Sequence, residues 1–109
     1  MWALLAHAPS GAVLESSWRT DVRSLVAAGL ARAGVGWPVE VWCDVPPEVA
    51  WQRYVERWPS VHPIHGALMT TDEWAAMVAH GEPLGLGPVI RVDTTRPVDV
   101  AALAATVRA

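Results

Sequence analysis

Three short apolar runs, each entered from glycine or proline, alternate along this chain with segments of helical periodicity. The runs cover residues 12–16, 38–43 and 88–93 and are typical of buried parallel strands. Helical patterns occupy residues 2–7, 20–33, 46–58, 70–80 and 97–107. Strands that alternate with helices in this way form parallel βαβ units with right-handed crossovers. The pattern therefore predicts an α/β fold, a three-layer parallel sheet of about three strands flanked by four to five helices.

Local signals fix several helix ends. Pro46 and Pro47 suit the first turn of the helix that runs to about residue 58, and Pro59 and Pro63 prevent it from continuing. Thr70 lies three residues before Glu73, the spacing of a capping box, so a new helix is expected there. Residues 59–69 are predicted to form a loop.

The size of the chain limits it to one core. A chain of 109 residues buries about two-thirds of the surface that its unfolded form exposes, so we expect a single domain over residues 1–109. Apolar residues make up 52% of the sequence and the mean hydropathy is +0.25. So little polar surface is available that we expect some apolar face to meet a partner.

Charge and cysteine content exclude several functions. The net charge is −3, and all eight basic residues are arginine, so no basic patch for nucleic acid is expected. The only cysteine, Cys43, permits neither an internal disulfide nor a thiolate cluster for zinc. The apolar opening segment has no cationic leader and is far shorter than the roughly 20 residues that span a bilayer. The sequence predicts a cytoplasmic protein with no membrane partner.

Order and spacing of four segments carry a resemblance to a known family. They are "VLESSW" from residue 13, "VEVWCDVPPEVAWQRYVER" from residue 39, "HPIHG" from residue 62 and "PVIRVDTTRPVDVAALAATVR" from residue 88. Together they resemble the carboxyl-terminal two-thirds of a small P-loop kinase. The similarity is to bacterial AAA-type ATP-binding proteins like the zeta-toxin and chloramphenicol-phosphotransferase kinases. It extends from about Gly11 to the end of the chain.

The resemblance implies an ATP-dependent kinase that uses Mg²⁺ and transfers phosphate to a small molecule. The helix motif R-x-x-x-R, here Arg53 and Arg57, would neutralise the transferred phosphoryl group, and both side chains can point the same way. Glu15, an acid at the end of a strand, would lie near the acceptor hydroxyl or the metal.

The resemblance also implies two nucleotide-binding loops. The segment Asp93, Thr94 and Thr95 matches a loop that wraps the adenine, mostly through main-chain groups. Residues 59–69 match a mobile lid.

One departure from the family pattern is decisive for activity. The phosphate loop G-x-x-x-x-G-K-[ST] is absent, no lysine is present, and neither "GVG" at 34–36 nor "GLG" at 85–87 lies between a strand and a helix as required. In the family, the strand before that loop lies between those matching 12–16 and 38–43. Truncation of a longer kinase would explain both the loss of this strand with its phosphate loop and the uncapped helix at Met1. We therefore expect the isolated chain to be inactive.

Each candidate residue also has a plainer interpretation. Arg53 and Arg57 can belong to a solvated helix face that pairs with Glu56. Glu15 can simply accept hydrogen bonds from nearby amides. The pair His62 and His65 has zinc-like spacing, but prolines break the helix that would orient it, so no metal site is expected. The seven tryptophans are expected to pack in the core or at an interface.

Two other functional classes stay open. The chain can be a non-catalytic α/β interaction module, a degenerate kinase half that docks on a protein partner or a second copy through the apolar edge of its sheet. It can also be a free-standing α/β enzyme that uses Glu15 or Cys43, which would require a pocket that no motif indicates.

Overall fold

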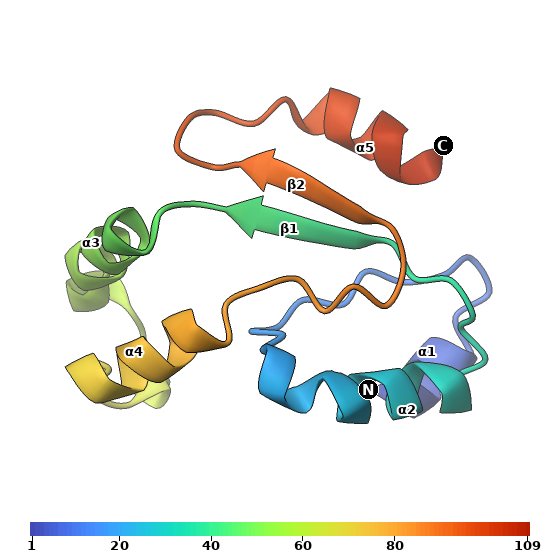
Figure 1. The fold of residues 1–109 in the computed structure, drawn as a ribbon, viewed down its shortest axis with the longest axis horizontal. Helices are drawn as coiled ribbons and strands as arrows, with labels where there is room; N and C mark the ends of the chain where they lie inside the picture. Colours follow the sequence, from blue (N-terminus) through green and yellow to red (C-terminus); the bar gives the residue numbers. More distant parts are fainter. The chain divides into compact units, whose positions relative to one another are not determined.

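A computed structural model describes residues 1–109 (Figure 1). These residues divide into two compact units. The first unit combines Met1–Val41 with His80–Ile90, and the second combines Trp42–Ala79 with Arg91–Ala109. Both strands of the sheet contribute residues to each unit. The chain is mixed α/β, with five α-helices and one sheet, as the alternating pattern predicts.

The sheet consists of two parallel strands, β1 (Glu40–Asp44) and β2 (Val89–Asp93) (Figure 1). At one end the main-chain N–H of Glu40 donates to the carbonyl of Pro88, and at the other the N–H of Thr94 donates to the carbonyl of Asp44, each over 2.9 Å. These contacts fix the register of the pair. The strands predicted at residues 38–43 and 88–93 are confirmed, with small shifts at their ends.

The strand predicted at residues 12–16 is not formed, so the sheet has two strands where three were expected. The segment lies outside every helix and strand, and residues 12–15 take part in no main-chain hydrogen bond. Val13 is 98% exposed. A β-branched apolar run has the composition of a strand, but only a neighbouring strand can satisfy its main-chain groups, and here it has none.

The first unit holds α1 (Trp2–Ala6), the 3₁₀ turn η1 (Thr20–Val22) and α2 (Arg23–Arg32). The chain turns after α2 at Gly34, which has a φ of 75°. Glycine suits this position because it adopts the left-handed conformation without steric cost. The two buried apolar residues of the protein, Val26 and Leu84, belong to this unit and are 7% and 8% exposed.

Trp2 packs directly on Gly29, a buried residue of α2. A Cβ atom at position 29 would overlap the indole ring of Trp2, so glycine is what lets α1 approach α2. The same indole lies 6.2 Å from the ring of Trp18, measured between centroids. The expectation that tryptophans serve packing holds for this pair.

The second unit holds α3 (Pro47–Arg57), α4 (Thr71–Ala79) and α5 (Val100–Arg108). Pro46 stands at the N-cap position of α3 without a side-chain capping bond, and Pro47 occupies the first turn, where a missing N–H costs nothing. Asp99 caps α5 by accepting from the N–H of Ala102 over 2.9 Å. All the predicted helices are therefore present.

The capping box predicted at the start of α4 is confirmed. The N–H of Glu73 donates to the hydroxyl oxygen of Thr70 over 3.2 Å, and the N–H of Thr70 donates to the Glu73 carboxylate over 2.7 Å. Two N–H groups that the helix cannot satisfy are thus satisfied reciprocally.

Four half-buried aromatic rings hold α3 and α4 together. Trp51 lies 5.2 Å from Trp74 and 5.6 Å from Tyr54, and Tyr54 lies 5.4 Å from Trp58, measured between ring centroids. Such offset and tilted contacts are favourable beyond the area they bury. These rings are the packing centre of the second unit.

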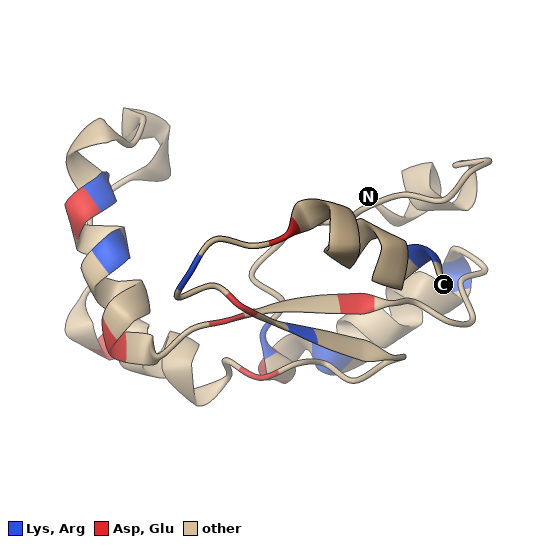
Figure 2. Cartoon of the chain, turned by 90° about the horizontal axis from the view of Figure 1, so that it is seen from above, with Lys and Arg blue, Asp and Glu red and all other residues tan.

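The charged residues are interspersed along the elements rather than collected on one of them (Figure 2). No helix of the chain combines the length and the apolar content needed to span a membrane.

Candidate functional site

Thr94 joins the carboxyl ends of the two strands in the second unit. Its main-chain N–H and its hydroxyl both donate to the carbonyl oxygen of Asp44, each over 2.9 Å. Because Asp44 is the last residue of β1, these bonds extend the pairing one residue beyond β2. The carboxyl ends of parallel strands are where open α/β sheets bind ligands, so this edge is the natural place for a site.

Arg53 reaches this edge from α3. Its Nη1 donates to the carbonyl oxygen of Thr94 over 2.8 Å, although the two residues are 41 positions apart. The contact uses one donor of a planar fork that has several. Two segments that the sequence singled out separately, the arginine helix and the residues after the last strand, therefore meet at the strand ends.

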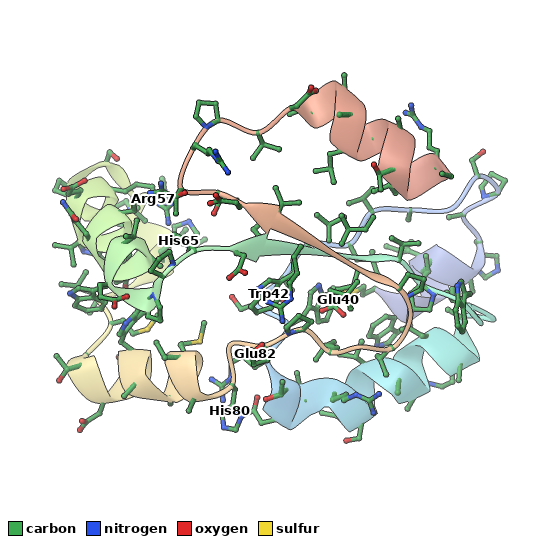
Figure 3. The ribbon with its side chains drawn as sticks, turned by 45° about the horizontal axis from the view of Figure 1, so that its top comes forward. Glu40, Trp42, Arg57, His65, His80 and Glu82 are labelled. Atoms are coloured by element: carbon green, nitrogen blue, oxygen red, sulfur yellow. The ribbon has the colours of Figure 1, made fainter.

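Arg57 lies one helical turn beyond Arg53 (Figure 3). It is exposed, and its guanidinium makes no hydrogen bond or ion pair. The Glu56 carboxylate accepts from the side-chain amide of Gln52 over 2.9 Å. It forms no ion pair with Arg53 or Arg57, so the local ion pair weighed as the plain alternative is absent.

The side chain of Asp93 organises the turn after β2. One carboxylate oxygen accepts from the N–H of Thr95 over 2.9 Å and from the Thr95 hydroxyl, and the other accepts from Nε of Arg96 over 3.2 Å. Hydrogen bonds from Thr95, first that of its hydroxyl, lower the pKa of Asp93 below its ordinary value, with a smaller contribution from the charge of Arg96.

The predicted nucleotide-binding residues Asp93, Thr94 and Thr95 thus form a turn whose side chains bond one another and the strand end. The N–H and the hydroxyl of Thr94 donate to the Asp44 carbonyl, and the Thr94 carbonyl accepts from Arg53. These residues shape the edge, and the Arg53 guanidinium contacts it through the Thr94 carbonyl.

Glu15 belongs to the first unit, in the segment that forms no strand. It is exposed, and its carboxylate has no hydrogen-bond or ion-pair partner. The site described above is built from the second unit without it.

The predicted lid, residues 59–69, is partly ordered into 3₁₀ turns, η2 (Trp58–Ser60) and η3 (Pro63–His65). The hydroxyl of Tyr54 accepts from the N–H of Met69 over 2.8 Å and ties the end of this segment to α3. Nδ1 of His62 accepts from the N–H of Ile64 over 3.2 Å.

No three His, Cys, Asp or Glu side chains are grouped so that they could hold a metal ion. Cys43 is exposed on β1.

Sequence reasoning missed an anion-binding turn in the first unit, around Glu40 (Figure 3). The Glu40 carboxylate accepts from the successive N–H groups of Leu84 and Gly85 over 2.8 and 2.9 Å, and Nε of Arg23 donates to the carbonyl of Leu84 over 2.7 Å. Successive amides form a nest for an anion, and here the protein's own carboxylate fills it. A charged residue inside an apolar strand run is the signal that could have drawn attention to Glu40.

Comparison with protein-family models, with curated proteins and with solved structures finds no match to this chain.

Proposed function

We propose that this chain is the carboxyl-terminal part of an ATP-dependent small-molecule phosphotransferase of the P-loop kinase type. The observation that supports the proposal is the contact of Arg53 with the Thr94 carbonyl. It brings a charged guanidinium of α3 to the carboxyl ends of two parallel strands, the edge at which this class of sheet binds its ligands. The finer architecture, a three-layer P-loop-like sheet, is part of the same proposal.

In this function Arg53 and Arg57 contact the phosphates of the nucleotide. Both are exposed, and neither forms an ion pair with Glu56. A guanidinium presents parallel donors that match phosphate oxygens. Residues 93–95 border the nucleotide, and the role that the resemblance implies for Glu15, near the acceptor hydroxyl or the metal, stays a prediction. Residues 59–69 act as the lid.

The donor set fits a polyphosphate better than it fits a metal. Two available guanidinium groups suit phosphate, whereas no acidic cluster for Mg²⁺ is present. Bound Mg²⁺ would neutralise charge on the phosphates. The chain's own contribution is to hold phosphate oxygens and to shape the edge beside them.

This contribution is insufficient for turnover by the isolated chain. Phosphoryl transfer depends on positioning the transferred group in line with its acceptor. The sequence has neither lysine nor the glycine-rich loop whose amides cradle a triphosphate. We therefore predict no ATP hydrolysis and only weak phosphate binding.

Isothermal titration with tripolyphosphate tests the proposal. We expect millimolar affinity for the unmodified chain and roughly 10-fold weaker binding for Arg57→Ala, the loss expected when a charged hydrogen bond is removed. Arg108→Ala is the matched control, since Arg108 is an exposed arginine in the last turn of α5. Absence of binding, or equal loss in both variants, contradicts the proposal. Micromolar ATP affinity would overturn the predicted weak binding.

An alternative function is that of a non-catalytic interaction module. The observation that favours it is the unpaired segment at residues 12–16, an apolar strand-former with its main chain and Val13 open to solvent. Such a segment is suited to pairing with the strand edge of a protein partner or of a second copy.

A further inference from the structure

Two hydrogen bonds hold α3 at neighbouring residues. Arg53 donates to the Thr94 carbonyl over 2.8 Å, and the Tyr54 hydroxyl accepts from the N–H of Met69 over 2.8 Å. The first bond joins the helix to the strand-end loop, residues 94–97, and the second joins it to the segment before α4. Arg57 lies one turn further on, so its direction is set by a helix that is already fixed on both sides.

Thr94 is the point at which β1, the loop after β2 and α3 meet. Its N–H and hydroxyl bind Asp44, and its carbonyl accepts from Arg53. Without Arg53, the two bonds to Asp44 remain, but the carbonyl of Thr94 loses its hydrogen-bond partner. The Arg53 guanidinium therefore adds a bond from α3 to a loop that is otherwise held by Asp44 and Asp93.

We propose that Arg53 couples phosphate binding to the order of the strand-end loop. A guanidinium is a planar fork, so Nη1 can stay on the Thr94 carbonyl while the remaining donors bind phosphate oxygens. An anion held by the same group keeps the side chain in the position that Thr94 requires. Coupling of this kind is reciprocal, so an ordered loop also favours phosphate. The identity of the ligand rests on the proposed function, whereas the loop contact does not.

Amide hydrogen exchange at Thr94 and Thr95, with and without tripolyphosphate, tests the coupling. In the free protein we expect Arg53→Ala to accelerate exchange at both amides roughly 10-fold, because local opening becomes easier. Arg57→Ala is the matched control, the same residue type one turn away on the same helix, and should leave exchange in the free protein unchanged. Tripolyphosphate should slow exchange in the unmodified protein and have no such effect in Arg53→Ala.

Arg53→Lys separates the loop contact at Thr94 from phosphate binding. It also serves as the second variant if Arg53→Ala fails to fold. Lysine keeps the charge and can donate to the Thr94 carbonyl, but it lacks the planar fork. We expect near-normal exchange in the free protein and little slowing by tripolyphosphate.

Three results would overturn the coupling. Unchanged amide exchange in free Arg53→Ala would show that the contact of Arg53 with Thr94 does not order the loop. Unchanged tripolyphosphate affinity in Arg53→Ala would show that phosphate does not use this residue. Failure of the unmodified protein to bind tripolyphosphate would refute the coupling and the proposed function together, while faster exchange in free Arg53→Ala would still establish the contact with Thr94.

Discussion

Asp93 illustrates how one side chain shapes the edge of the sheet. It accepts from the N–H and the hydroxyl of Thr95 and from Nε of Arg96, so three donors converge on a single carboxylate. Each donor favours the charged form, and the pKa of Asp93 is lowered. A lowered pKa in the folded state means that ionised Asp93 stabilises the fold. This stabilisation is present above the unfolded pKa of about 3.9 and is lost as the pH falls through the lower folded value.

At this scale we predict that Thr95→Val raises the pKa of Asp93 toward its ordinary value, because the largest cause of the shift is the Thr95 hydroxyl. Carboxyl carbon shifts followed through an acid titration by NMR measure it. Thr94→Val is the control, since the Thr94 hydroxyl donates to Asp44 and not to Asp93. An Asp93 that titrates at the ordinary value in the unmodified protein would contradict the hydrogen bonds described.

The residue scale also shows what sequence can say of a site. The resemblance singled out Arg53 through its spacing to Arg57 within a proline-started helix, which are both local features. Its partner could not be found in this way, because the acceptor is the main-chain carbonyl of Thr94, and every residue has such a carbonyl. The hydrogen bonds of Glu40 to Leu84 and Gly85 escaped notice for the same reason.

At the scale of elements, α4 depends on a signal that lies just before the helix. Thr70 and Glu73 satisfy each other's main-chain N–H groups. Thr71 follows directly, is exposed, and its hydroxyl has no hydrogen-bond partner. The two threonines therefore differ in their hydrogen bonding and form a matched pair.

We predict that Thr70→Ala lowers the free energy of unfolding by about 1 kcal/mol, the usual value of a capping hydroxyl. Thr71→Ala should change it by no more than about 0.5 kcal/mol. Urea unfolding followed by tryptophan fluorescence measures both, because Trp74 lies in α4. Equal losses in the two variants would mean that the hydroxyl of Thr70 does not cap the helix.

The difference between local and non-local hydrogen bonds explains which elements could be predicted from the sequence and which could not. Helices close their hydrogen bonds within a few residues, so proline, capping residues and periodicity were sufficient for α3, α4 and α5. A strand closes its hydrogen bonds with another segment. Residues 12–16 and 38–43 both have apolar, strand-like compositions, yet only the second found a neighbour, in β2. Composition could not tell them apart.

At the scale of the whole molecule, the apolar content exceeds what the fold buries. Apolar residues are 52% of the chain, but Val26 and Leu84 are its only buried hydrophobic residues, and no side chain is fully buried. The second unit has no buried hydrophobic residue, and its packing rests on half-buried aromatic rings. A chain with this balance gains stability when another polypeptide covers apolar surface.

We therefore predict that the protein self-associates through residues 12–16, with the weight-average sedimentation coefficient rising with concentration. Val13→Lys should suppress the rise, since a charge on an unpaired strand opposes edge pairing. Val100→Lys is the control, because Val100 is also largely exposed but lies on α5. A monomer at every concentration, or the same effect from both variants, would contradict self-association at this segment.

The contact of Trp2 with Gly29 interlocks two positions far apart in the chain. Because a methyl group at 29 would occupy the space of the indole, bulk can be added there only if it is removed at position 2. Alanine at 29 would raise helix propensity by about 1 kcal/mol and still be unfavourable while tryptophan remains. The side chains tolerated at position 29 therefore depend on the residue at position 2. In a library that varies both positions, folded variants should combine one small and one large residue, and pairs of two large residues should be missing.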